Sequence, residues 1–225
     1  DDETRLGPKR ACAQGWITKP AMRRGIALTT ILSCIVGLPL IFYGGWQMIA
    51  VGAVCVLFCF LYTTCMSYMG LGDVLVIVFF GFVPVCLTYY LEMPPGTPLV
   101  GSAIFLNSLA CGLVIDTLLI VNNYRDIDND RRAGKKTLVV RIGAKASEIL
   151  YLALGFAACI LGLGLFYYRS VWAAFLPFIY LVMHIHTYRE MVRIRKGAEL
   201  NRVLGMTARN MFFYGLLQSV GLIIC

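Results

Sequence analysis

The sequence predicts an all-α fold, a polytopic transmembrane helical bundle of about seven helices. The chain has 225 residues, of which 59% are hydrophobic and only 14% are charged, and its mean hydropathy is +0.76. An ordinary soluble domain is far less apolar. The sequence also lacks the alternating apolar pattern of an outer-membrane barrel strand, so helices are the expected spanning elements.

Seven apolar stretches approach or exceed the roughly 20 residues that a helix needs to cross the hydrocarbon layer. Along the chain they run from about Gly25 to Tyr43, Gln47 to Met66, Val74 to Leu91, Leu99 to Asn122, Ile149 to Tyr168, Val171 to Met191 and Val203 to Cys225. No linker rich in Ser or Gly divides them. We therefore expect residues 1–225 to form a single domain embedded in a lipid bilayer.

The net charge of +8 is confined to alternate connections, which argues for a membrane and against nucleic acid as the partner. Six cations precede the first stretch, seven lie between Arg125 and Lys145, and five between Arg189 and Arg202. By the positive-inside rule these segments, with the amino terminus of the chain, are expected in the cytoplasm and the carboxyl terminus outside.

The most polar segment of the chain directly follows the fourth apolar stretch. Continued as a helix, it would carry Asn122, Asp126 and Asp130 at i, i+4 and i+8, on one face. Three oxygen-bearing side chains at this spacing suit a hard divalent cation such as Mg²⁺. An EF-hand is excluded because its sixth position is Arg131 rather than Gly, and its twelfth is Thr137 rather than Glu.

Several cations follow these acids, and the combination indicates a diphosphate. Carboxylates leave some Mg²⁺ positions to phosphate oxygens, and basic side chains contact the remaining oxygens. A phosphate-binding P-loop is excluded, because Asn129 stands where its first Gly is required. At a membrane surface the expected diphosphate carries a lipid tail.

Two motifs resemble those of the UbiA superfamily of intramembrane prenyltransferases. Asn122-x-x-x-Asp126-x-x-x-Asp130, followed by Ala133-Gly134-Lys135-x-Thr137-Leu138, is similar to the second aspartate-rich motif. Asp1-x-x-x-Arg5-x-Gly7-Pro8-x-Arg10 is similar to the end of the first. The form of both motifs, with Tyr68-x-Gly-Leu-Gly-Asp73 and Thr207-Ala-Arg-Asn210, most resembles the branch that prenylates 1,4-dihydroxy-2-naphthoate in menaquinone synthesis.

The resemblance implies a role for each matched residue. Metal ligands would be Asp1, Asn122, Asp126 and Asp130, of which the three aspartates are the expected catalytic acids. Diphosphate contacts would be Arg5, Arg10 and Lys135, with Lys9, Arg131 and Lys136 as further candidates. Aromatic faces for the acceptor or the allylic cation would be Tyr62, Tyr68 and Tyr124.

The implied activity is Mg²⁺-dependent transfer of a polyprenyl group from an allylic polyprenyl diphosphate to 1,4-dihydroxy-2-naphthoate, with loss of the carboxylate. This places the protein in the cell (inner) membrane, with the motif loops and the opening of the site in the cytoplasm. One alternative is another acceptor, such as homogentisate, 4-hydroxybenzoate or haem. A second is a membrane transporter with a cation site, although transporters usually bind near the bilayer midplane.

The chain departs from the superfamily pattern at two places. Members have about nine transmembrane helices and a first motif that begins upstream of the position of Asp1, so we expect the amino-terminal part to be missing from this sequence. The superfamily often has a Lys four residues after a Tyr at the end of the fourth helix, whereas Met66 follows Tyr62 here.

Two further acids lie near or within apolar stretches. Asp116 is inside a predicted span, where an acid usually faces a cavity or a partner; pairing with Asn123 is as good an interpretation as function. Asp73 follows Gly72 at the predicted start of a helix, where a carboxylate favours the helix dipole, so capping is one interpretation.

Overall fold

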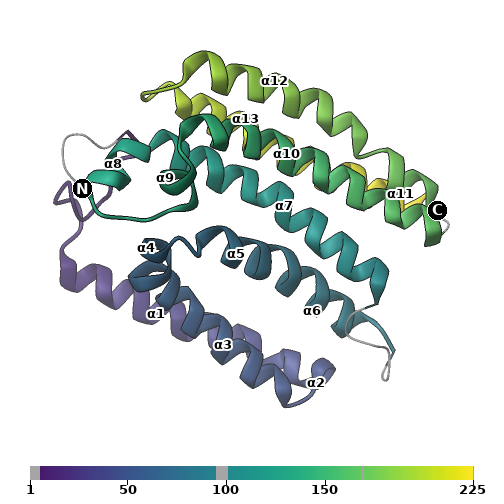
Figure 1. Cartoon of the computed structure of the whole chain (residues 1–225). Coiled ribbons are helices and arrows are strands. Elements are labelled where there is room, and N and C mark those ends of the chain that lie inside the picture. Colours follow the sequence, from purple (N-terminus) through teal and green to yellow (C-terminus); the bar gives the residue numbers. More distant parts are fainter. Residues whose placement is uncertain (1–5, 95–100, 169, 225) are drawn as a thin grey trace.

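The computed structural model of the chain describes residues 6–94, 101–168 and 170–224, and it is built from helices joined by short connections (Figure 1). These residues contain no β-strand. The expected all-α bundle is therefore confirmed. Asp1 and Arg5 of the first motif lie outside the described residues.

Three helical rods come first, each made of consecutive helical segments with little or no break. Their segments are α1 Lys19–Gly37, η1 Leu38–Leu40 and α2 Ile41–Gly44; then α3 Gln47–Leu61, η2 Tyr62–Met66 and α4 Ser67–Met69; then α5 Gly72–Val76, η3 Ile77–Phe82 and α6 Val83–Glu92. The segments η2 and η3 are π-helical, and η1 is a 3-10 turn. The hydroxyl of Thr18 accepts a hydrogen bond from the Ala21 N–H and so caps the start of α1.

The rest of the described chain adds four long helices and three short ones. They are α7 Ser102–Arg125, α8 Ile127–Arg132, α9 Leu138–Ile142, α10 Ala144–Gly162 continued by η4 Leu163–Tyr168, α11 Val171–Phe175, α12 Phe178–Ile194 and α13 Leu200–Ile223. In Figure 1 the rods of α1, α3 and α5 to α6 lie on one side of α7, and α10, α12 and α13 lie on the other.

Six of the seven expected spans are long and apolar enough to cross a membrane within the described residues. They are Lys19–Gly44, Gln47–Met69, Gly72–Glu92, Ser102–Arg125, Ala144–Tyr168 and Val171–Ile194. The seventh expected span forms α13, a helix of 24 residues that does not reach the same hydropathy. It carries Arg209, Asn210 and Gln218, which lower its hydropathy. The protein is an integral membrane protein.

Helix α7 lies at the centre of the packing. It contacts α10, η3 and α13, and its residues Ile120, Val121 and Tyr124 belong to a buried cluster with residues of α10, α12 and α13. On the other side its backbone meets η3 closely, because a Cβ on Gly81 would lie 2.7 Å from the Cα of Gly112. Small residues that let helix backbones approach are the usual means of helix association in lipid.

Candidate active site

The polar segment after α7 is not one continuous helix, which corrects the expectation of a single helix from Asn122 to Asp130. Helix α7 ends at Arg125, Asp126 has φ −96° and ψ 9°, and α8 begins at Ile127. The backbone hydrogen bonds from Asp126 N to Asn122 O (3.2 Å) and from Asp130 N to Asp126 O (2.8 Å) nevertheless cross the break. The interruption has an electrostatic reason: it places Asp130 in the first turn of a new helix, where carboxylates interact favourably with the helix dipole.

Arg125 joins two of the predicted metal ligands. Its Nε and Nη2 donate to Asp126 Oδ1 and Oδ2 at 2.9 and 2.6 Å, and Nη2 also donates to Asn122 Oδ1 at 3.0 Å. The Arg125 side chain is only 4% exposed. A guanidinium held by this fork has little freedom, so it fixes the orientation of both oxygen-bearing side chains.

The same guanidinium connects the second motif to the start of the described chain. Arg125 Nη1 donates to Asn201 Oδ1 at 2.8 Å, and Asn201 Nδ2 donates to the backbone carbonyl of Leu6 at 2.8 Å. Leu6 directly precedes the Gly7-Pro8-x-Arg10 part of the first motif. Thus the first and second motifs, which are far apart in sequence, lie close together and are linked through α13.

Lys135 and Tyr68 meet next to Asp130, as expected for residues of one site. The ammonium of Lys135 lies 2.9 Å from Asp130 Oδ1 and 5.6 Å from the centre of the Tyr68 ring. The backbone N–H of Lys136 donates to the carbonyl of Tyr68 at 3.0 Å. These contacts dock the loop after α8 onto the turn between α4 and α5.

Gly70 allows this docking because its position admits no side chain. Its φ is 79°, in the left-handed region, and a Cβ there would collide with the backbone carbonyl of Lys136. Arg141 joins the two sides of this contact, because its Nη2 donates to Met69 O at 2.6 Å and its Nε donates to Lys136 O at 3.1 Å.

The remaining predicted diphosphate contacts are exposed. Lys9, Arg10, Arg131 and Lys136 all lie on the surface. Arg131 is 3.8 Å from the Asp128 carboxylate, which Lys196, in the connection between α12 and α13, also contacts at 3.0 Å.

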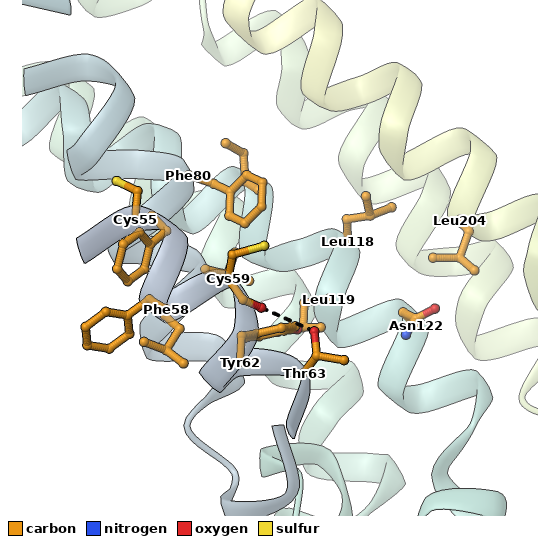
Figure 2. Close-up of a pocket in the computed structure, with 14 residues that line it drawn as sticks. Cys55, Phe58, Cys59, Tyr62, Thr63, Phe80, Leu118, Leu119, Asn122 and Leu204 are labelled. Atoms are coloured by element: carbon orange, nitrogen blue, oxygen red, sulfur yellow. Dashed lines mark hydrogen bonds between the residues drawn. The ribbon is translucent and has the colours of Figure 1, made fainter. Parts of the chain in front are cut away.

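An apolar cavity of about 540 Å³ lies between α3, η3 and α7, and Asn122 is one of its lining residues (Figure 2). Its lining residues are Cys55, Phe58, Cys59, Tyr62, Thr63, Leu75, Val76, Phe79, Phe80, Ile115, Leu118, Leu119, Asn122 and Leu204. Both π-helical segments contribute to the wall, η2 through Tyr62 and Thr63 and η3 through Phe79 and Phe80. Such π-helical insertions are frequent at functional sites.

The three predicted aromatic residues have different surroundings. Tyr62 lines the cavity, and its side chain lies beside that of Leu119 in Figure 2. Tyr68 contacts Lys135 instead. Tyr124 is buried in the core, where its hydroxyl donates to Glu148 Oε1 at 2.6 Å, and it is not among the residues that line the cavity.

The donor set at the second motif fits a hard cation by its chemistry. Asn122, Asp126 and Asp130 offer only oxygen atoms, and each accepts a hydrogen bond from Arg125 or Lys135. Within the described residues, no group of three or more His, Cys, Asp or Glu side chains is arranged to hold a metal. Asn122, Asp126 and Asp130 stay the predicted ligands of the second motif, and Asp1 lies outside the described residues.

Sequence reasoning missed Arg125 and Asn201. Arg125 follows Asn122 by three positions, so the two share a helix face, and this spacing was the available signal. Asn201 gave no local signal, because its partners are 76 and 195 positions away in sequence.

The helical membrane fold, the paired motifs and the apolar cavity define an integral membrane protein with a candidate site for a lipid diphosphate. The chain belongs to the UbiA prenyltransferase family, whose model matches residues 1–216. No solved structure matches the chain.

Curated relatives come from bacteria and animals. The chain is 30% identical to a 1,4-dihydroxy-2-naphthoate octaprenyltransferase of Escherichia coli, in an alignment that covers 99% of this chain and 74% of the relative. It is 35% identical to a protein of the same name from Mycobacterium tuberculosis, over 68% of this chain and 52% of that protein. UbiA prenyltransferase domain-containing protein 1 of Mus musculus is 30% identical over 73% of this chain and 47% of its own length. The chain thus spans between about half and three quarters of these relatives.

Proposed function

We propose that the protein transfers a polyprenyl group from an allylic polyprenyl diphosphate to 1,4-dihydroxy-2-naphthoate, with loss of the carboxylate, as a step of menaquinone synthesis. The observation that carries this proposal is the junction at Asn122, which lines the apolar cavity and also accepts a hydrogen bond from Arg125. A polar anchor in the wall of an apolar cavity suits a diphosphate with an isoprenoid tail. The names of the relatives from Escherichia coli and Mycobacterium tuberculosis support the naphthoate acceptor.

In this proposal Asn122, Asp126, Asp130 and Asp1 hold Mg²⁺, and all four offer the oxygen ligands that this ion prefers. Bound there, the metal would neutralise the charge that develops on the departing diphosphate. Arg125 orients Asn122 and Asp126 from the protein side. It is a positioning residue rather than a ligand.

The cations of both motifs bind the diphosphate oxygens in the same proposal. Lys135 is the best placed of the described ones, because it is anchored by Asp130 and by the Tyr68 ring. Arg5 and Arg10 would contribute from the first motif, and Lys9, Arg131 and Lys136 from the exposed rim. Charge-assisted hydrogen bonds to phosphate are stronger than neutral ones, so these residues would bind the diphosphate group itself.

The prenyl tail occupies the cavity, and Tyr62 is positioned to face the allylic cation. An aromatic ring attracts a cation that lies over its face, most strongly where water is excluded. The wall around Tyr62 is apolar apart from Thr63 and Asn122, so it keeps water from the reactive carbon. The electron-rich ring carbon of the naphthoate attacks this carbon as the diphosphate leaves.

We further propose that residues 1–225 act as one prenyltransferase domain in the cell (inner) membrane. The basic segments and both motifs would face the cytoplasm, and α13 would end on the external side.

The deciding experiment measures prenyl transfer by membranes that contain the full-length protein. Product should form from a polyprenyl diphosphate and 1,4-dihydroxy-2-naphthoate, stop when EDTA removes Mg²⁺, and return when Mg²⁺ is restored. Asp126→Ala should abolish it, whereas Glu199→Gln, at a loop position outside both motifs, should not. Transfer to homogentisate or 4-hydroxybenzoate in place of the naphthoate would refute the acceptor, and full activity in Asp126→Ala would refute the site.

A further inference from the structure

Two buried carboxylates that the proposed reaction does not use border the apolar cavity. The side chains of Asp73 and Asp116 are 7% and 2% exposed, and the Oδ1 atom of each is buried without a hydrogen-bond partner. Within the described part of the chain, neither forms an ion pair with a Lys, Arg or His side chain. A buried, unpaired acceptor is costly, and ionisable residues inside a membrane span generally mark a functional site.

Both acids lie one helical turn from the cavity wall. Asp116 precedes Leu119 by three residues on α7, and Asp73 precedes Val76 by three on α5, so each is adjacent to a lining residue on its own helix. Helices α5 and α7 pack against each other, which brings the two acids into the same part of the bundle.

Tyr62 completes this arrangement at the wall of the cavity. A Cβ on Gly72, the residue before Asp73, would lie 3.9 Å from the Tyr62 hydroxyl and 3.5 Å from the Leu119 side chain. Asp73, next to Gly72, and Asp116, three residues before Leu119, therefore lie near the part of the cavity that Tyr62 and Leu119 line.

Structural roles account for the two acids only in part. Asp73 lies in the first turn of α5, where a carboxylate interacts favourably with the helix dipole, but its Oδ1 atom has no hydrogen-bond partner. Pairing with Asn123 leaves the Asp116 Oδ1 atom unexplained, since that atom has no partner. The pair instead offers two hydrogen-bond acceptors that protein groups do not satisfy.

We infer that Asp73 and Asp116 bind the aromatic acceptor by accepting a hydrogen bond from the phenolic hydroxyl group that is more distant from the acceptor's carboxylate. This inference rests on the proposed function and specifies where the acceptor lies in the same site. In 1,4-dihydroxy-2-naphthoate this group is the 4-hydroxyl, and a hydroxyl that donates to a carboxylate forms one of the stronger hydrogen bonds available in a protein.

The pair also determines how the acceptor is oriented. A negatively charged carboxylate is disfavoured beside two buried acids that have no cationic partner among the described residues, so the acceptor's own carboxylate turns away from them and toward Lys135. The 4-hydroxyl is more distant from that carboxylate than the 1-hydroxyl is. It occupies the end of the site at Asp73 and Asp116. An acceptor without this hydroxyl leaves the buried carboxylates unsatisfied and binds less well.

The test compares steady-state kinetics of the purified full-length protein with its Asp73→Asn and Asp116→Asn variants. Each variant keeps the shape of the side chain and removes the charge. The KM for 1,4-dihydroxy-2-naphthoate should rise about 10- to 100-fold, the range expected for losing a hydrogen bond to a charged group. The KM for the polyprenyl diphosphate should change less than about twofold. Gln218→Met is the matched control, because both polar atoms of Gln218 are buried and unpartnered but no residue three or four positions from it lines the cavity. Its acceptor KM should stay at the wild-type value.

A second measurement does not depend on the variants folding. The wild-type protein should bind 1-hydroxy-2-naphthoate at least about tenfold more weakly than 1,4-dihydroxy-2-naphthoate, and this difference should shrink in Asp116→Asn. Equal affinity of the wild type for both compounds, or an unchanged acceptor KM in both Asn variants, would overturn the inference. A wild-type protein that forms no prenylated naphthoate would instead refute the proposed function, so the two failures are distinguishable.

Discussion

The Arg125 guanidinium holds the Asp126 carboxylate through two parallel hydrogen bonds, of 2.9 Å from Nε to Oδ1 and 2.6 Å from Nη2 to Oδ2. Asp126 lies at the break between α7 and α8, where the backbone itself does not fix the direction of the side chain. The orientation of a proposed metal ligand therefore depends on a side chain that does not bind the metal.

Arg125→Lys should lower prenyl transfer at least about tenfold, because one ammonium group cannot reproduce the bidentate contact with Asp126 and the bonds to Asn122 and Asn201. The Mg²⁺ concentration that gives half-maximal activity should be higher in Arg125→Lys than in the wild type. Arg193→Lys is the matched control, since Arg193 forms a similar fork with Glu190 on an exposed surface. A variant with the wild-type Mg²⁺ dependence would contradict the positioning role.

Gly70→Ala should weaken the docking of the Lys135 and Lys136 loop, because the new Cβ meets the Lys136 carbonyl and the residue has a φ of 79°. We expect a loss of about 1–3 kcal/mol in stability and a higher KM for the polyprenyl diphosphate. Gly134→Ala separates backbone strain from the collision with the Lys136 carbonyl, since Gly134 has a φ of 72° but nothing within 4 Å of an added Cβ. In a thermal unfolding experiment in detergent, Gly134→Ala should therefore lose only the stability that backbone strain accounts for.

Gly155→Ala should destabilise the bundle without altering substrate KM values. An added Cβ would collide with the ring of His184, which stacks on Tyr151 at 4.5 Å between ring centres and bonds to the Tyr151 carbonyl at 3.1 Å. Overpacking of this kind costs about 1–3 kcal/mol. Gly162→Ala, on the same helix with nothing near the added Cβ, should be neutral or slightly stabilising. Equal melting temperatures for the two variants would argue against the close contact.

Cys59→Phe should shift the product toward shorter prenyl chains. Cys59 lines the cavity, and a ring at this position would take up space that the distal part of the tail needs. Mass spectrometry of the product formed from a mixture of diphosphates of different length would show the shift. Cys34→Phe, at an exposed position of α1 outside the cavity, is expected to leave the product distribution unchanged.

The fold was largely predictable because the length and hydropathy of apolar segments follow directly from the thickness of the bilayer. The second motif was also identifiable, since Asn122, Asp126 and Asp130 carry their spacing in the sequence. Spacing could not reveal the break at Asp126, because bonds of the i to i+4 type cross it and the pattern suits both one helix and two. The last expected span, Val203 to Cys225, forms α13, whose hydropathy is below that of the other spans because it carries polar side chains. Asn210 and Gln218 are among them, and both are buried against protein.

The cavity and the contacts of Asn201 could be identified only from the three-dimensional arrangement of the chain. The cavity wall comes from separate stretches of the chain, and the close approach of Gly81 and Gly112 that fixes one side of it leaves no periodic signal. Asp73 and Asp116 were both identified as unusual, but their proximity to each other emerged only from the packing of α5 on α7.

The bonds that join Leu6 to Asn201 and Asn201 to Arg125 have a consequence for the biosynthesis of the protein. Ribosomes synthesise a chain from its amino terminus, so the segment around Leu6 and the whole of α7 are made long before α13. During that interval Arg125 and the Leu6 carbonyl lack their shared partner. The two motifs can be fastened together only after α13, the last of the described helices, has been made and has packed against α7, so the candidate site forms at the end of synthesis and not with the helices that carry it.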